Sequence, residues 1–148
     1  EHHKGKMASI FYQLYHQIME TGEARLFRGT DGLADGEQRR DFVYVGDVVR
    51  VNLHFFTHGG VSGIYNCGTG VAHSYNEAAH AVIAALGKGR IVYRDFPEVL
   101  RGKYQNYTQA DTSALLAAGY DGGFTPMEEA VKEYCDFLHA GGYFSYAE

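Results

Sequence analysis

The segment that most constrains the fold runs from Arg39 to Val49 and reads RRDFVYVGDVV. Its residues 42–45 are aromatic or β-branched, which favours a strand. Gly46 allows a sharp exit from that strand, and Asp47 is a residue type that caps the free N–H groups of a helix. The segment therefore predicts a strand that leads directly into a helix. Because residues 48–56 are mostly apolar, this helix is expected to be well buried.

The rest of the chain predicts helices and strands in alternation. Helices are indicated by apolar residues at three- and four-residue steps, or by Ser, Thr or Asp at capping positions, over residues 7–21, 74–86, 112–118 and 125–140. Short β-favouring runs predict extended or strand segments at residues 25–29, 63–67 and 91–93. This alternation predicts an α/β protein, although these strands are too few to close a core.

Composition excludes several functional classes. The 148 residues are 45% hydrophobic and 21% charged, which is typical of one globular domain. A net charge of -5 with dispersed basic residues argues against a nucleic-acid partner. No apolar run approaches membrane-spanning length, and no signal peptide is evident, so no membrane contact is expected. Cys67 and Cys135 lack metal-ligand spacing and are expected to be reduced core residues of a cytoplasmic protein without a metal.

Two loops carry residues suited to an anionic ligand. Arg39 and Arg40 stand beside the glycine-containing loop 29–40, where two cations suit a phosphate or carboxylate, although a solvated basic corner is the plain alternative. The glycine spacing in that loop resembles a dinucleotide fingerprint, but a strand follows where the fingerprint needs a helix. In the loop 98–107, cations alternate with aromatic residues such as Tyr104, which suits a nucleotide; an ordinary surface loop is again the alternative.

The segment from Arg40 to Val48 also resembles a motif of the extended short-chain dehydrogenase/reductases, which epimerise, dehydrate or reduce nucleotide sugars. Other matching motifs follow in order: HKGxMAS at 3–9, LFxG at 26–29, VSGIYNxGTG at 61–70, FPxxLxGKYQ at 96–105, TQAD at 108–111 and AGYD at 118–121. Together they cover nearly the whole chain. Their order and spacing resemble most the branch that epimerises ADP-heptose at carbon 6 for lipopolysaccharide core synthesis.

This resemblance implies the fold and organisation of the chain. It implies the carboxyl-terminal part of an NAD(P)-binding Rossmann-like enzyme, together with its small α/β substrate domain. Residues 1–148 contain neither a strand followed by GxxGxxG nor the Tyr-x-x-x-Lys pair of these enzymes. We therefore expect residues 1–148 to be the substrate-binding portion with the last strands of the Rossmann sheet. The amino-terminal dinucleotide-binding half is expected to be missing, and the fragment alone to be inactive.

The resemblance also implies a reaction and its residues. The family oxidises the C6 hydroxyl by hydride transfer to NADP and returns the hydride to the opposite face, which requires an acid/base on each side. Lys4 matches one of these groups and a cofactor contact, although it reads equally as a surface lysine. The substrate contacts fall on Lys6, Gln13, Phe27, Arg28, Gly29, Thr30, Arg40 and Tyr104. Lys6 and Gln13 depart from the family's usual Ser and His. A homo-oligomer is implied as well.

Two other functions stay open from the sequence. The chain could be part of another nucleotide-sugar epimerase or reductase, which preferences among ADP, UDP and dTDP sugars would distinguish. Alternatively, it could be a non-catalytic truncated fragment that acts as a folded ligand-binding or assembly module. Turnover measurements on the isolated 148 residues separate this alternative from an active enzyme.

Overall fold

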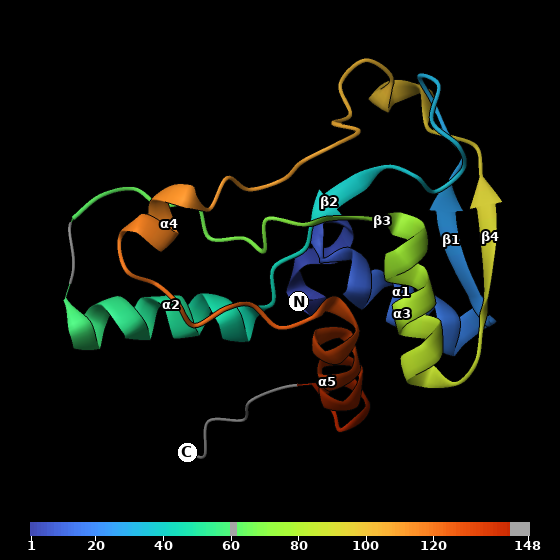
Figure 1. Ribbon diagram of the computed structural model, residues 1–148. Helices are drawn as coiled ribbons and strands as arrows, with labels where there is room; N and C mark the ends of the chain where they lie inside the picture. Colours follow the sequence, from blue (N-terminus) through green and yellow to red (C-terminus); the bar gives the residue numbers. More distant parts are fainter. Residues whose placement is uncertain (60–61, 143–148) are drawn as a thin grey trace.

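The computed structural model describes residues 1–59 and 62–142, without the side chains of His2 and Lys6. In these ranges the chain forms short 3-10 turns, helices and strands in mixed order (Figure 1). The elements are η1 His2–Met7, α1 Ile10–Thr21, β1 Glu23–Phe27, β2 Arg39–Asp41, α2 Val45–His58, β3 Ala72–Ser74, α3 Tyr75–Leu86, β4 Arg90–Arg94, η2 Glu98–Leu100, α4 Ser113–Ala117 and α5 Met127–His139. The α/β class expected from the sequence is confirmed.

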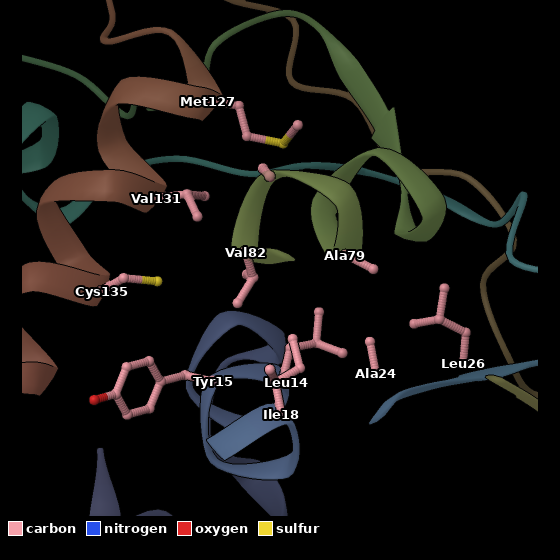
Figure 2. Close-up of a cluster of buried hydrophobic side chains, with 11 residues drawn as sticks. Leu14, Tyr15, Ile18, Ala24, Leu26, Ala79, Val82, Met127, Val131 and Cys135 are labelled. Carbon is pink, nitrogen blue, oxygen red and sulfur yellow. The ribbon is translucent and has the colours of Figure 1, made fainter. Parts of the chain in front are cut away.

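The main core lies between α1, α3, α5 and the parallel pair of strands β1 and β4. The strands pair from Glu23 opposite Arg90 to Phe27 opposite Arg94. Figure 2 shows side chains of α1 and α3 facing one another, with those of α5 closing the cluster. The buried residues of this main core are Leu14, Tyr15, Ile18, Ala24, Leu26, Ala79, Ala81, Val82, Met127, Val131 and Cys135. Burial of this apolar surface supplies the chief driving force for folding.

A second, smaller sheet places the basic pair. β2 pairs antiparallel with β3, with Arg40 opposite His73. On its other side, β2 exchanges backbone hydrogen bonds with residues 106–108: the Arg39 N–H donates to the carbonyl of residue 106, and the Asp41 N–H to that of residue 108. The long loop after β4 is therefore held against β2.

The region around α2 and α4 lies apart from β1 and β4 (Figure 1). Its small cluster contains three buried residues, Val51, Leu115 and Tyr120. The expectation that α2 is well buried was wrong, because one apolar stripe of the helix faces solvent. This α2 stripe consists of Val45, Val49, Leu53 and Phe56, of which Phe56 is 86% exposed.

The strands predicted at residues 42–45 and 63–67 are not formed in the described structure. Residues 42–44 have no regular structure, and α2 already begins at Val45. Residues 63–67 form no strand either, and Ile64 among them is 99% exposed. A strand needs a neighbour for its backbone groups, and the described residues provide none at either segment. The sequence missed β3 instead, a three-residue strand that pairs with β2.

Two predicted helix caps were also wrong. Asp47 lies in the first turn of α2 rather than at its cap, and its side chain is fully buried. Its carboxylate accepts hydrogen bonds from the N–H (2.9 Å) and the hydroxyl (2.7 Å) of Thr125. It also forms an ion pair with Arg50. Thr125, the predicted cap of α5, is thus engaged with Asp47, and Pro126 occupies the cap position of α5 without a side-chain bond. Both residues join α2 to the start of α5.

For the remaining helices, the bounds predicted from local sequence signals agree with the structure to within a few residues. The predicted capping box of α3 is confirmed: the Glu77 N–H donates to the Ser74 hydroxyl, and the Ser74 N–H to the Glu77 carboxylate. Gly22 ends α1 in the left-handed conformation at φ 73°, which an L side chain adopts at a cost. Cys135 is a free thiol in the main core, as predicted, whereas Cys67 is free but only partly buried. Within the described residues, no helix has the length and apolar character needed to cross a bilayer.

Candidate functional site

Aromatic rings form a connected row across the molecule. Successive centroids lie 5.0 Å apart for Phe11–Phe42, 5.9 Å for Phe42–Tyr75, 5.4 Å for Tyr104–Phe96 and 5.4 Å for Phe96–Phe27, all edge to face. The Tyr104 hydroxyl joins the two halves by donating to the Tyr75 hydroxyl at 3.0 Å. We call Phe11, Phe42, Tyr75, Tyr104, Phe96 and Phe27 the aromatic row. It links α1, the β2–α2 connection, α3, the loop after β4, and β1.

Arg40 lies against the middle of this row. Its guanidinium carbon is 5.0 Å from the ring centre of Tyr104 and 6.0 Å from that of Tyr75. One nitrogen donates to the carbonyl of Arg39 at 2.7 Å. In the part of the chain that the structure describes, Arg40 forms no ion pair. A guanidinium with spare donors and no carboxylate partner suits a phosphate oxygen.

The neighbouring arginine is differently placed. The Arg39 guanidinium lies 3.5 Å from the Glu37 carboxylate and 3.7 Å from that of Glu77, and it donates to the carbonyl of Ala72 at 3.1 Å. These groups use its charge and donors within the protein. The structure thus separates the two members of the basic pair: Arg39 fastens the loop to α3 and β3, whereas Arg40 is available for a ligand.

Residues 27–30 continue from the end of β1 beside the row. The guanidinium carbon of Arg94 lies 4.6 Å from the centre of the Phe27 ring. Arg28 pairs with Asp35 (3.5 Å) and Asp95 (3.2 Å), so its charge is balanced. Gly29 donates its N–H to the Asp35 carboxylate at 2.9 Å, and a Cβ at this position would overlap the backbone of residues 33–34, which explains the glycine. Thr30 is buried at the turn that follows.

The predicted residues from the start of the chain lie at the other end of the row. Lys4, on η1, pairs its ammonium with the Glu1 carboxylate at 2.8 Å and is about half exposed. Gln13, on α1, donates from its amide to the carbonyl of Ala8 at 2.7 Å. Phe11 on the same helix begins the row. The side chain of Lys6 lies outside the described residues. The structure therefore brings Arg40 and Tyr104 into direct contact and links Phe27 to Tyr104 through Phe96, whereas Lys4 and Gln13 lie on η1 and α1, near the end of the row that Phe11 begins.

Asp41 holds the backbone beneath Arg40 and was missed by the sequence reasoning. Its carboxylate accepts the N–H (2.9 Å) and hydroxyl (2.6 Å) of Thr69, and the N–H groups of Gly70 (2.9 Å) and Ala110 (3.1 Å). Burial alone raises the pKa of Asp41, but these donors outweigh burial and hold the pKa below its ordinary value. Asp41 thus ties β2 to the 68–70 turn and to the loop after β4.

Tyr104 is a neutral hydrogen-bond donor. Burial raises its pKa well above the usual value for a phenol, the bond to Tyr75 raises it further, and the charge of Arg40 lowers it only in part. Because its proton goes to Tyr75, the Tyr104 oxygen can accept a hydrogen bond from a ligand hydroxyl, beside a guanidinium that can bind an anionic oxygen. No group of three or more His, Cys, Asp or Glu side chains within residues 1–59 and 62–142 is placed to hold a metal.

The class of protein follows from fold and sequence comparison together. Residues 1–68 match the NAD dependent epimerase/dehydratase family. The chain is 56% identical over 136 residues to an ADP-L-glycero-D-manno-heptose-6-epimerase from Alkalilimnicola ehrlichii, covering 92% of this chain and 42% of that protein. Its identity to the Thiobacillus denitrificans protein of the same name is 47% over 153 residues, covering 93% of this chain and 46% of that protein.

A solved structure agrees with these relatives. The ADP-L-glycero-D-manno-heptose-6-epimerase of Helicobacter pylori superposes with a TM-score of 0.75 at 31% identity, over 93% of this chain and 40% of that one. The chain is therefore a homologue of ADP-L-glycero-D-manno-heptose-6-epimerases over nearly its whole length, its residues 1–68 match the NAD dependent epimerase/dehydratase family, and the resemblance found in the sequence is confirmed. It spans less than half the length of these relatives.

Proposed function

We propose that the chain is the substrate-binding portion of a nucleotide-sugar epimerase that interconverts ADP-D-glycero-D-manno-heptose and ADP-L-glycero-D-manno-heptose at carbon 6. The observation that carries this proposal is Arg40, a guanidinium with no ion pair in the described chain, held between Tyr75 and Tyr104. It is found in a homologue of proteins named for that reaction. A nucleotide sugar carries a diphosphate, which such a guanidinium binds.

The other predicted substrate residues fit around this contact. Arg40 binds the diphosphate, and the neutral Tyr104 hydroxyl, which donates to Tyr75, accepts a hydrogen bond from a ligand hydroxyl. Phe27, Arg28, Gly29 and Thr30 form the wall at the end of β1. Lys6 and Gln13 are assigned to the sugar end; Gln13 reaches it only after releasing the carbonyl of Ala8. In this proposal the nucleotide lies along the aromatic row and the heptose lies toward η1.

Lys4 is proposed as the acid/base on one face of carbon 6. Its ammonium is about half exposed and pairs with the Glu1 carboxylate, so it can turn toward a substrate hydroxyl. Lys4 takes the proton of the C6 hydroxyl of one epimer and, in the reverse direction, gives a proton to the C6 ketone oxygen on that same face; the acid/base on the opposite face does the same for the other epimer. Bound NADP would supply the acceptor and donor of hydride at carbon 6. Lys4 fits a contact to that cofactor, but the described residues contain no glycine turn between a strand and a helix to hold it.

We further propose that the cofactor is held by a dinucleotide-binding portion that accounts for the remaining length of the relatives. Two features of the described chain support an interaction surface for this dinucleotide-binding portion. The α2 stripe exposes four large apolar residues. Beside it lies an apolar cavity of about 260 Å³, lined in part by Val43 and Val45. Contiguous exposed apolar surface is characteristic of an interaction site. Residues 1–148 would then be the carboxyl-terminal portion, and strands from the dinucleotide-binding portion would pair with residues 42–44 and 63–67.

The setting of the enzyme is proposed from its relatives and its thiols. Two free cysteines suit a reducing compartment, and we place the protein in the cytoplasm. A homo-oligomer is proposed for the complete enzyme.

Nucleotide preference tests the substrate assignment. Thermal shift of the 148-residue chain should be larger with ADP-sugars than with UDP- or dTDP-sugars at equal concentration. Arg40→Ala should weaken ADP binding roughly tenfold or more, because a hydrogen-bonded charge pair contributes about 1.5–3 kcal/mol. The matched control is Arg101→Ala, which removes an arginine already paired with Glu98. A clear preference for UDP or dTDP would instead assign the chain to another nucleotide-sugar epimerase or reductase.

A lysine substitution tests the acid/base assignment. With the dinucleotide-binding portion of a relative added, Lys4→Met should lower the epimerisation rate at least about a hundredfold. Glu1→Gln is the control, since it removes the Lys4 partner and leaves the amine. A loss below about tenfold for Lys4→Met would contradict an acid/base role.

A further inference from the structure

We infer that Tyr75 is a positioning residue for the substrate: it holds Arg40 in place through Tyr104. This inference deepens the proposed function, because it concerns the residue assigned to the diphosphate. Neither the family motifs nor the sequence-based substrate contacts include Tyr75. Its role is argued from three sets of contacts, one to the main core, one to Tyr104 and one to Arg40.

The first set fixes Tyr75 itself. It is the first residue of α3 and directly follows Ser74, the cap residue that forms a capping box with Glu77. Its backbone N–H donates to the carbonyl of Gln38 at 3.1 Å. Its ring packs against the main core and meets Phe42 edge to face at 5.9 Å. A tyrosine anchored by its apolar body presents its hydroxyl from a rigid base.

The second set fixes Tyr104, which has a less rigid base. Tyr104 lies in the long connection between η2 and α4, and its N–H donates to the carbonyl of Leu100 at 3.0 Å. Beyond its edge-to-face contact with Phe96, its side chain is held by the hydroxyl bond to Tyr75 at 3.0 Å. That bond connects a loop side chain to a helix of the main core, and it sets the direction of the Tyr104 ring.

The third set concerns Arg40. A long side chain without an ion pair loses rotamer entropy when it binds a ligand, unless the protein has already restricted it. The guanidinium lies against both rings, at 5.0 Å from Tyr104 and 6.0 Å from Tyr75. One donor is engaged by the Arg39 carbonyl, and the remaining edge is free for an anion. The pair of rings therefore restricts Arg40 before the diphosphate arrives.

A merely structural role for Tyr75 would predict something different. The ring alone fills space beside Phe42, and Tyr75→Phe retains that ring. The Tyr75 hydroxyl accepts the hydrogen bond from Tyr104. Tyr75→Phe therefore removes this link between α3 and the loop after β4 without opening a cavity. Tyr93→Phe is the matched control: it also removes one hydroxyl hydrogen bond, to Asn76 at 2.9 Å, and does not contact Arg40.

The experiment combines side-chain NMR with calorimetry on the 148-residue chain. In the free chain, the Arg40 side-chain protons should be shifted upfield by the two rings, and Tyr75→Phe should reduce this shift while Tyr93→Phe leaves it unchanged. With ADP as the probe, Tyr75→Phe should lower the affinity roughly threefold to tenfold, and Tyr93→Phe should not change it. Circular dichroism confirms that each variant is folded.

The two readouts separate failure of this inference from failure of the proposed function. If Tyr75→Phe leaves the Arg40 resonances unchanged, Tyr75 does not position Arg40 and the inference is overturned, whatever the affinities. If Arg40→Ala retains the ADP affinity of the unaltered chain, the diphosphate assignment fails, while the NMR result still decides the role of Tyr75. If Arg40→Ala weakens binding and Tyr75→Phe does not, Arg40 binds the ligand without help from Tyr75.

Discussion

α1 and α2 are both amphipathic helices of similar length, but they differ in what covers their apolar faces. α1 buries Leu14, Tyr15 and Ile18 in the main core, against α3 and β1. α2 buries Val51 and the carboxylate of Asp47, while its stripe of four apolar residues faces solvent. The pattern of a helix predicts that one face prefers burial, and it does not reveal whether the covering surface belongs to the same segment. The difference supports the proposal that the α2 stripe is an interface.

The largest effect should come from the main core. Leu14→Ala removes a fully buried side chain, and we expect it to lower the free energy of unfolding by about 2–5 kcal/mol. Leu53→Ala makes the same chemical change on the α2 stripe and should cost no more than about 0.5 kcal/mol. Urea denaturation followed by circular dichroism compares the two. Equal losses would show that Leu53 is covered in solution.

The attachment of α2 gives the next largest effect. Asp47→Ala leaves the N–H of Thr125 and the Arg50 guanidinium without their buried acceptor, and should cost about 2–3 kcal/mol. Hydrogen exchange should rise in α2 before it rises in α1. Asp136→Ala, which removes an exposed carboxylate paired with Lys132, should have little effect. Unchanged exchange in α2 after Asp47→Ala would show that the small cluster holds the helix without this carboxylate.

These two regions also show what the sequence could predict. The capping box of α3 and the glycine at the end of α1 are local signals and were predicted correctly. The predicted strands 42–45 and 63–67 rested on β propensity, which forms a strand only where a neighbouring strand is available. Asp47 and Thr125 are residue types that cap helices, but here they bind each other although they are 78 positions apart in the sequence.

The candidate site divides in the same way. Arg40 and Tyr104 were predicted because they lie in family motifs, and the structure adds the reason why Arg39 is not a ligand contact: its guanidinium lies beside the Glu37 and Glu77 carboxylates. Tyr75 and Asp41 act through contacts with residues distant in sequence. A usable signal existed for Asp41, which immediately follows Arg40 in the matching motif. Tyr75 had no signal beyond its place after a capping serine.

Asp41 gives a smaller effect that depends on pH. Its folded-state pKa lies below the ordinary value, so its ionised form stabilises the fold above the unfolded pKa of about 3.9. This contribution is lost as the pH falls through the lower, folded pKa. Asp41→Asn should therefore cost about 1–2 kcal/mol at pH 7 and progressively less below about pH 4. Urea titrations of both proteins at pH 7 and pH 3 measure this; a cost that does not fall at pH 3 would rule out the carboxylate charge as its source.

The smallest effect on stability should come from the end of the α2 stripe. Phe56→Ser should change the free energy of unfolding by no more than about 0.5 kcal/mol, because the ring is largely exposed. It should nevertheless weaken association with a dinucleotide-binding portion supplied by a relative, as measured by analytical ultracentrifugation. Glu98→Ser, at an exposed position on η2, is the control. Association unaffected by Phe56→Ser would place the interface away from α2.

Complementation tests the central claim most directly. The 148-residue chain is incubated with ADP-D-glycero-D-manno-heptose and NADP, alone and together with the remaining portion of the Alkalilimnicola ehrlichii relative, and the C6 epimer is measured by chromatography. We predict epimerisation only in the mixture, and its loss when Arg40 is replaced by Ala. Turnover by the 148-residue chain alone, or none in a mixture in which the two portions demonstrably associate, would contradict the account.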